Sequence, residues 1–207
     1  MIDAAALEAC VAGGGVAVFP ADTVYGLACD PRDAAAIRRL YELKGRPPDK
    51  PAAVLFFALA DALGELGDLG PRTRAALQEL LPGALTLLLP DPRGRFPLAG
   101  GPDRHTLGVR VPAWPPALAE LGRVGRPVLQ SSANLAGGAD PRRLREVPAA
   151  IRAGADLVLD GGELPGAPST VVDLHAYEDG GAWSILRAGA VAPERIAAVL
   201  GAAARAR

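Results

Sequence analysis

The sequence predicts an α/β fold in which helices flank one mixed sheet, and three observations support this prediction. Short apolar runs typical of buried strands recur along the chain and alternate with segments of helical periodicity. Strands interleaved with helices are the pattern of α/β proteins. The length suits one domain of ordinary size, so we expect residues 1–207 to form a single domain. Only nine residues are aromatic, which predicts a core built mainly from Ala, Val, Leu and Ile.

The helices are predicted from their apolar spacing and from the residues that start and stop them. Asp33 can cap a helix whose apolar face includes Ala36, Ile37 and Leu40, and the glycines 13–15 can end an earlier one. The remaining helices are expected from similar signals. In order, the predicted helices cover residues 3–12, the segment that Asp33 caps, and residues 72–81, 115–122, 143–153 and 193–204.

The strands are predicted from short apolar runs that are too short for a helix. Residues 20–26, which follow the first run, are predicted to form a turn, and residues 90–105, which are rich in Gly, Pro and Arg, are predicted to form an exposed loop. The predicted strands are 16–19, 53–57, 85–89, 106–111, 127–130, 156–159, 170–174 and 183–187.

Charge and cysteine content predict a cytoplasmic protein with no membrane partner. The net charge of −1 gives no overall field that would draw the protein to nucleic acid or a membrane surface. Cys10 and Cys29 stand alone, as reduced thiols of cytosolic proteins do. The N-terminus lacks the basic region of a secretory signal. The longest apolar stretch, 52–60, is far shorter than the roughly 20 residues that a membrane helix needs.

Only two lysines occur in the chain, Lys44 and Lys50, and they lie close together in a segment that also holds Arg46. Lysine is a compact point charge, whereas arginine is a planar fork. Prolines in the same segment stiffen the backbone around these charges. Such a segment could hold a polyanion, for example a nucleotide triphosphate. A solvated loop of ordinary charges is the alternative interpretation.

Polar side chains lie at or near the ends of several predicted strands, where active sites of α/β proteins tend to form. If they converge on one cleft, arginines, hydroxyls and an amide would suit phosphates together with a carboxylate. Each residue also has an ordinary structural explanation, as a turn, a helix cap or a charge at a rim. The residues concerned are Thr23, Tyr25, Arg110, Ser132, Asn134, Ser169 and Arg187.

The order of the motifs resembles that of the YrdC-like family, over roughly residues 8–200. Each motif alone is weak, but seven in the same order are specific, above all Lys-x-Arg followed by Ser-x-Asn. The motifs are Pro20-Ala-Asp-Thr-Val-Tyr-Gly-Leu27, Lys44-Gly-Arg-Pro47, Leu81-Pro-Gly-Ala-Leu-Thr-Leu87, Val109-Arg-Val-Pro112, Ser132-Ala-Asn134, Ser169-Thr-Val-Val-Asp173 and Leu186-Arg-Ala-Gly189.

The resemblance implies a fold and a reaction. The fold would be a twisted, mixed parallel and antiparallel sheet, flanked by helices around a central positive cleft. The reaction would join L-threonine, bicarbonate and ATP into threonylcarbamoyl-AMP and pyrophosphate, as in the threonylcarbamoyl-AMP synthases of this family. The product would serve the t6A modification of adenosine 37 in tRNA, through downstream threonylcarbamoyl-transferase proteins. Mg²⁺ would be bound mainly through phosphates and water, since no carboxylate cage is visible and no residue is expected to be a metal ligand.

The resemblance also implies roles for individual residues. Lys44 and Arg46 are expected to hold the ATP phosphates and to be the catalytic pair, because two anions must be neutralised and aligned. Arg110 is expected to bind the threonine carboxylate as a fork. The further nucleotide contacts implied are Thr106, Ser132, Asn134 and Arg187, and the further threonine contacts are Thr23, Tyr25 and Ser169.

The sequence departs from the family pattern at Ala21, Leu55, Ser131 and Ala136, where threonine, histidine, proline and serine are common. A related enzyme that forms a carbamoyl adenylate with another acceptor therefore stays open as an alternative.

Each of three other functions is matched or outweighed by a simpler explanation. A non-catalytic RNA-binding module could use the basic run 142–145, although a solvated helix face paired in part by Glu146 explains the run as well. A serine hydrolase lacks its Gly-x-Ser-x-Gly elbow, and His105 and His175 are expected to be ordinary surface residues. The cysteines and histidines do not show the spacing of a zinc site.

Overall fold

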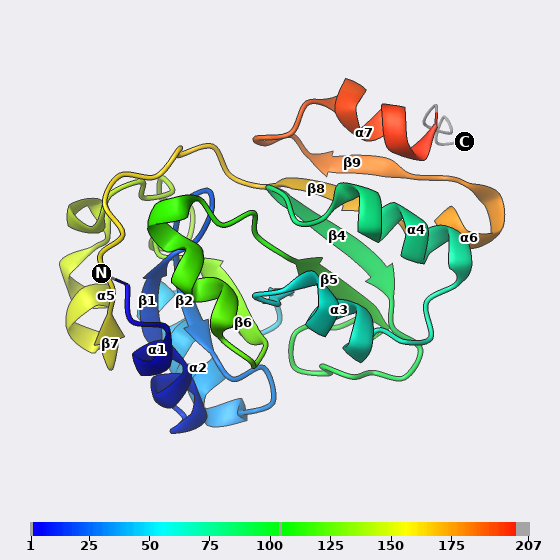
Figure 1. Cartoon of the computed structure of the whole chain (residues 1–207). Coiled ribbons are helices and arrows are strands. Elements are labelled where there is room, and N and C mark those ends of the chain that lie inside the picture. The colour runs from blue at the N-terminus through cyan, green and yellow to red at the C-terminus, as the bar shows by residue number, and fades with distance from the viewer. Residues whose placement is uncertain (1, 104, 202–207) are drawn as a thin grey trace.

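The structure, a computed structural model, describes residues 2–103 and 105–201, in which nine strands form one sheet (Figure 1). The strand order is β7-β1-β2-β6-β3-β5-β4-β8-β9. Three neighbouring pairs are parallel, β1 with β7, β3 with β5 and β4 with β8, and the others are antiparallel. This confirms the predicted mixed sheet. The strands are β1 Ala17–Pro20, β2 Tyr25–Cys29, β3 Ala53–Leu55, β4 Leu85–Pro90, β5 Thr106–Arg110, β6 Val128–Ser132, β7 Leu157–Val158, β8 Thr170–Asp173 and β9 Ser184–Arg187.

Helices lie beside both ends of the sheet. Figure 1 shows α1, α2 and α5 near β7, β1 and β2, whereas α4, α6 and α7 lie near β4, β8 and β9. Two short 3₁₀ helices, η1 (Pro116–Arg123) and η2 (Leu144–Glu146), lie in the connections. The helices are α1 Ala4–Ala12, α2 Ala34–Lys44, α3 Leu59–Glu65, α4 Pro71–Leu80, α5 Ala149–Gly154, α6 Tyr177–Gly180 and α7 Pro193–Leu200.

Helix α2 has well-defined ends, and the lysine segment begins at its last residue. Its N-cap is Asp33, as predicted, and the carboxylate accepts hydrogen bonds from the backbone N–H groups of Ala35 and Ala36 at 2.8 and 3.1 Å. Its C-cap is Gly45, whose φ of 59° lies in the left-handed region that glycine adopts without steric cost. The helix therefore ends directly after Lys44, and the chain turns there toward Arg46.

The central strands have two different faces because side chains alternate along a strand. In β4, Leu85, Leu87 and Leu89 are buried in the core, whereas Thr86 and Leu88 point to the opposite face and line a cavity. In β5, Gly108 and Arg110 likewise face the cavity. Register aligns these positions, since Leu88 lies opposite Gly108. The core behind the sheet is mostly aliphatic, as predicted.

Strand β2 was missed, because residues 20–26 were predicted to be a turn. Its Gly26 gives little strand signal, but a Cβ at this position would lie 2.6 Å from Nε2 of Gln130 and 3.2 Å from the backbone carbonyl oxygen of Ser131, so these neighbours would have to shift. Strand β6 continues through Ser131 and Ser132, which were expected to follow it. Strand β3 ends at Leu55, two residues before the predicted end.

The helix predicted over 143–153 is wrong as a single element. It is divided into η2 and α5, since Pro148 lacks an N–H group and holds the preceding Val147 in an extended conformation. The segment 115–122 forms a 3₁₀ helix rather than an α-helix. The short helices α3 and α6 were not predicted, and neither has a side-chain cap. Residues 202–204 of the last predicted helix lie outside the described residues.

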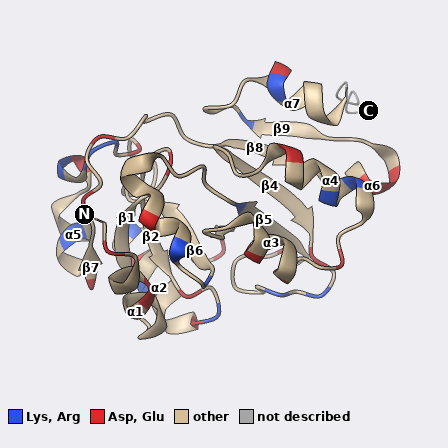
Figure 2. Cartoon of the chain, viewed as in Figure 1, with Lys and Arg blue, Asp and Glu red and all other residues tan. Residues whose placement is uncertain are grey.

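Pro90 ends β4, and the described residues after it, up to His105, form no strand or helix. Asp91, Phe96 and Ala99 are buried, so the prediction of an exposed loop holds for only part of the segment 90–105. Positive and negative residues are interspersed over the helices and loops, in keeping with the nearly balanced net charge (Figure 2). Within residues 2–103 and 105–201, every helix is too short or too polar to cross a membrane.

Replacing Asp33 by alanine is expected to lower the free energy of unfolding by about 1 kcal/mol, because two backbone N–H groups of α2 lose their acceptor. The urea midpoint should fall with an unchanged m-value. Asp33→Asn should retain most of the stability, and Glu42→Ala on the exposed side of α2 should change it by less than about 0.5 kcal/mol. A midpoint of Asp33→Ala equal to that of Glu42→Ala would contradict the capping role.

Candidate active site

A cavity of about 460 Å³ lies on the polar face of the central strands. Strands β3, β4, β5, β6, β8 and β9 and the segments that follow β1 and α2 contribute to its wall. Its volume falls in the range of roughly 300–1,000 Å³ that is usual for ligand pockets. Seven of the ten predicted site residues line it: Thr23, Arg46, Thr106, Arg110, Ser132, Ser169 and Arg187. Tyr25, Lys44 and Asn134 lie outside the lining that the described residues form.

The ammonium group of Lys44 is buried against the end of β6. Its Nζ atom donates to the backbone carbonyl of Ser132, to that of Asn134 at 2.8 Å, and to Oδ1 of Asn134 at 3.0 Å. The backbone carbonyl of Lys44 accepts in turn from the N–H group of Ala136 at 2.8 Å. An ammonium has three donors, so all of them are used. Lys44 thus fastens the end of α2 to the loop that follows β6.

Burial lowers the pKa of Lys44 to about 8, because desolvation disfavours the charged amine. The nearby charge of Arg46 lowers the pKa further, whereas Asp140 raises it. A lysine pKa of about 8 is unusual, and shifts of this kind are typical of functional sites. The loop that it holds is also ordered by side chains, since Ser132 Oγ donates to Oδ1 of Asn134 at 2.6 Å.

Arg46 brings a cation to the cavity without a carboxylate partner among the described residues. Its Nη2 atom donates to the carbonyl of Pro51 at 2.6 Å, and its guanidinium lies 5.7 Å from the ring centroid of Tyr41. The hydroxyl of Tyr41 donates to the carbonyl of Lys50 at 2.9 Å. The segment between Gly45 and Pro51 is therefore tied to α2, and it presents Arg46 to the cavity.

Arg110 is buried at the floor of the cavity, with only 4% of its surface exposed. Its guanidinium donates to Oδ1 of Asp22 and to Oε1 of Gln130, both at 2.8 Å. A longer bond of 3.3 Å reaches Oγ1 of Thr23. These partners fix the plane of the guanidinium, and Asp22 supplies a charge of opposite sign.

The residues predicted for threonine and those predicted for the nucleotide meet at Ser169. The hydroxyl of Ser169 lies 2.8 Å from that of Thr86, and Nη2 of Arg187 donates to its carbonyl at 2.8 Å and to its hydroxyl at 3.1 Å. Register accounts for this cluster, because Thr86 lies opposite Val171 and Val171 lies opposite Arg187. Two neighbouring subsites in one cavity would therefore share this wall.

Thr106 lies at one end of the cavity in a chain of polar contacts that the sequence did not suggest. Its Oγ1 donates to Oδ2 of Asp103 and lies 2.9 Å from Nε2 of His175. The Nδ1 atom of His175 lies 2.7 Å from Oδ1 of Asp173. His175 was expected to be an ordinary surface residue, but it connects the end of β8 to β5.

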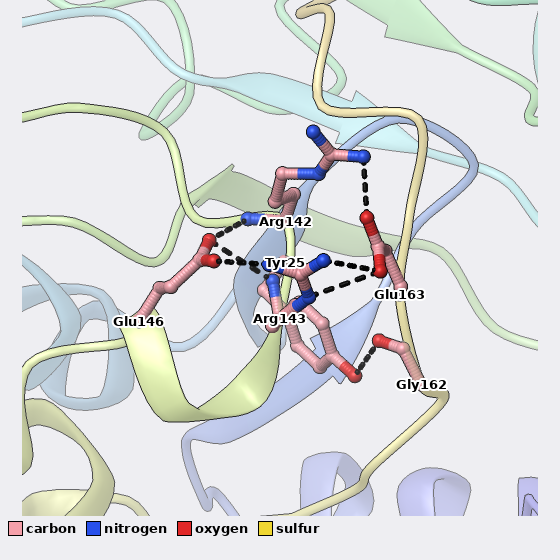
Figure 3. A network of polar contacts seen from close by, with 6 residues as sticks. All are labelled: Tyr25, Arg142, Arg143, Glu146, Gly162 and Glu163. Atoms are coloured by element: carbon pink, nitrogen blue, oxygen red, sulfur yellow. Dashed lines mark hydrogen bonds and ion pairs between the residues drawn. The ribbon is translucent and has the colours of Figure 1, made fainter.

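Tyr25 is fully buried outside the described lining of the cavity. Its hydroxyl reaches the segment 160–162, and Figure 3 shows it beside Gly162. The hydroxyl donates to Oδ1 of Asp160 at 2.8 Å, lies 2.8 Å from the carbonyl oxygen of Gly162, and accepts from the N–H group of Gly161. Burial and the Asp160 carboxylate raise the pKa of Tyr25 well above its usual value. The geometry favours a supporting role in which Tyr25 holds the chain that leads to Ser169.

The basic run 142–145 is largely engaged by two glutamates (Figure 3). Arg142 and Arg143 both pair with Glu163, and Arg143 also pairs with Glu146 at 3.5 Å. The carboxylate of Glu146 accepts from the backbone N–H group of Arg142 at 2.9 Å. These arginines therefore join two loops and do not form a free basic surface.

Several polar residues of the cavity were missed in the sequence. Thr86 is the single polar residue in an apolar strand, and Gln130 lies two positions before Ser132, on the same face of β6. Either position could have indicated from the sequence that the residue lines the cavity. Asp103 and Asp140 also line the cavity, and they lie in segments without periodicity.

The described residues contain no group of three or more His, Cys, Asp and Glu side chains that could hold a metal ion. Asp103 and Asp140 are the carboxylates in the described lining. Such a wall fits a cation that is bound mainly by phosphates and water, which is the usual mode of Mg²⁺ at nucleotides.

Comparisons with known proteins identify the family. The Sua5/YciO/YrdC family model, described as telomere recombination, matches residues 9–189. A threonylcarbamoyl-AMP synthase of Bacillus subtilis is 35% identical over 191 residues, which are 90% of this chain and 53% of that protein. The chain spans about half the length of the first such relatives that it matches.

Solved structures of similar proteins have the same fold. Sua5 of Pyrococcus abyssi, complexed with L-threonine, aligns with a TM-score of 0.77 and 30% identity over 96% of this chain and 57% of that one. YciO of E. coli aligns with a TM-score of 0.77 and 26% identity over 93% of this chain and 92% of that one. Together with the family model, which matches most of the sequence, these likenesses show that the chain belongs to the Sua5/YciO/YrdC family.

Proposed function

We propose that this protein is an L-threonylcarbamoyladenylate synthase. The amine of L-threonine and bicarbonate would form a carbamate with loss of water. A carbamate oxygen would then attack the α-phosphorus of ATP, and pyrophosphate would leave. The observation that carries this proposal is the arrangement of Arg46, Arg110 and Arg187 around one cavity, with hydroxyl groups between them. Two anions that repel each other need such a set of fixed cations and donors to react.

The phosphates of ATP would lie at Arg46, Ser132 and Arg187. Arg46 and Arg187 have no carboxylate partner among the described residues, so their charge is available to a polyanion. Lys44 would act by its charge and by holding the Ser132–Asn134 loop, in which Asn134 shapes the wall. Thr106 would be a further contact at the end of the cavity.

The carboxylate of L-threonine would lie at Arg110, with the hydroxyl groups of Thr23 and Ser169 beside it. Two features of relatives support this choice of substrate. Curated relatives are named threonylcarbamoyl-AMP synthases, and Sua5 of P. abyssi was solved with L-threonine. Among the positions that depart from the family pattern, Ala21, Leu55 and Ala136 lie outside the described lining of the cavity, whereas Ser131 belongs to it.

In the cell, the product would serve the t6A modification of tRNA. Its labile mixed anhydride would pass to threonylcarbamoyl-transferase proteins, so tRNA would be an indirect partner. We place this activity in the cytoplasm, with Mg²⁺ bound through the phosphates of ATP and water.

The proposal is tested by incubating the purified chain with ATP, Mg²⁺, bicarbonate and labelled L-threonine. Release of pyrophosphate that requires both threonine and bicarbonate is the expected result. Release without threonine would contradict the proposal, as would binding of tRNA without any turnover, which would favour an RNA-binding module.

Replacing Arg110 by alanine is expected to raise the KM for threonine by about 100-fold, since a charge-assisted contact contributes roughly 1.5–3 kcal/mol. The KM for ATP should change by less than about threefold. Steady-state kinetics measure both constants. Arg39→Ala, which removes an arginine paired with Asp156 on the surface, is the matched control and should leave both unchanged. Equal effects of Arg110→Ala on the two substrates would refute this assignment.

Nucleotide binding is expected to weaken by about tenfold as the pH rises through about 8, because Lys44 loses its charge there. The fold itself should not weaken. The pKa of Lys44 is lower in the folded protein than in the unfolded chain, so the unfolded chain binds more protons between about pH 8 and 10. The contribution of Lys44 to the free energy of unfolding therefore rises over that window.

The measurement is the Kd of a non-hydrolysable ATP analogue between about pH 7 and 9, with Lys44→Met as the comparison. The variant should bind weakly at every pH. A Kd that stays constant over this range in the unaltered protein would show that the charge of Lys44 does not act on the nucleotide.

A further inference from the structure

Of the three arginines that line the cavity, Arg110 is the one with a carboxylate partner among the described residues. Arg46 and Arg187 instead donate to neutral oxygens, the carbonyl of Pro51 for Arg46 and the carbonyl and hydroxyl of Ser169 for Arg187. The arginines of the cavity are therefore of two kinds. Arg46 and Arg187 have no carboxylate partner among the described residues, whereas the charge of Arg110 is compensated by a carboxylate.

The partner of Arg110 is Asp22, which lies outside the described lining of the cavity. Their atoms Nη2 and Oδ1 are 2.8 Å apart, and the two side chains are 5% and 4% exposed. Asp22 precedes Thr23, which itself lines the cavity and accepts from Arg110. Asp22 is thus a buried residue that is connected to the cavity through its contact with Arg110.

Each charge of this pair depends on the other. Burial lowers the pKa of Arg110, the carboxylate of Asp22 opposes that shift, and the charge of Arg187 adds to it. Burial likewise raises the pKa of Asp22, and Arg110 opposes that shift. Other neighbours of the pair are neutral, since Thr23 and Gln130 supply a hydroxyl and an amide. Removing one member would leave an uncompensated buried charge.

We propose that Asp22 determines specificity: by neutralising Arg110 it makes this part of the cavity accept the carboxylate of a net-neutral amino acid and reject phosphate anions. This inference rests on the proposed function. A zwitterionic amino acid has no net charge, whereas ATP, pyrophosphate and phosphate have several negative charges. Coulomb attraction scales with the product of the charges, so compensation of Arg110 penalises the phosphates far more than the amino acid.

Without this compensation, all three arginines would attract phosphate anions in the same way. Arg187 is close enough to influence the pKa of Arg110, so one polyphosphate could engage both cations. The nucleotide, or the pyrophosphate product, would then occupy the place that the amino acid needs. The compensated guanidinium still has one Nη1 hydrogen that is not donated to Gln130, and this hydrogen can bind a carboxylate oxygen.

Asp22→Asn tests the proposal, because it keeps the shape and one acceptor oxygen while removing the charge. Inorganic phosphate should become an inhibitor competitive with threonine, with an inhibition constant at least about tenfold lower than in the unaltered protein. The KM for threonine should rise, and the KM for ATP should change by less than about twofold. Chloride at equal ionic strength controls for screening.

Asp156→Asn is the matched control. It removes a carboxylate from an Asp–Arg pair whose side chains are about 45% exposed, and it changes the net charge by the same amount. Its phosphate inhibition should equal that of the unaltered protein. A folded Asp22→Asn protein with unchanged phosphate inhibition overturns the proposal, because a merely structural role would not alter the response to anions.

If Asp22→Asn is too unstable for kinetic measurements, the midpoint of thermal unfolding is measured with and without phosphate instead. Phosphate should raise the midpoint of Asp22→Asn more than that of the unaltered protein or of the double variant Asp22→Asn/Arg110→Gln. Equal shifts overturn the proposal. This measurement needs no turnover, so it decides the role of Asp22 separately from the proposed function, which fails if the unaltered protein releases no threonine-dependent pyrophosphate.

Discussion

The candidate site depends on one buried contact, the one between the ammonium of Lys44 and the end of β6. The three donors of Lys44 join two segments that are about 90 residues apart in the chain. One segment then presents Arg46, and the other presents Ser132. Burying an amine costs free energy, and its lowered pKa records that cost. The carbonyl groups around it offset the cost and give both segments a fixed position.

Successive side chains of a strand face the core and the cavity in turn, and this alternation decides which charged residues reach the cavity. Apolar residues of β4 and β5 face the core, and the residues between them face the cavity. Arg110 emerges at the floor, where desolvation is strongest and a carboxylate is needed to compensate it. Arg187 emerges on the exposed edge strand, where water screens its charge and neutral partners suffice. Burial therefore explains why one arginine is paired and the other is not.

Sequence patterns within a few residues correctly predicted those elements whose ends and faces depend on neighbouring residues in the chain. Asp33 and the apolar spacing after it gave α2 correctly, and seven of the ten site residues predicted from the sequence line the cavity. Gly26 concealed β2, because the close contacts that favour glycine there come from Gln130 and Ser131 on another strand. Pro148, a local signal, was overlooked and divided a predicted helix. The engagement of every Lys44 donor could not be predicted, because it depends on where a distant loop folds back.

The register of the strands determines how far apart the cavity residues on neighbouring strands lie. Thr86, Val171 and Arg187 lie side by side on β4, β8 and β9, so backbone pairing sets the position of Arg187 relative to Thr86. Adding one residue within β4 would turn Thr86 into the core, and a slip of two residues would displace it by about 7 Å. Changes in length are therefore compatible with activity in the surface loops and incompatible with it inside these strands, even where the protein still folds.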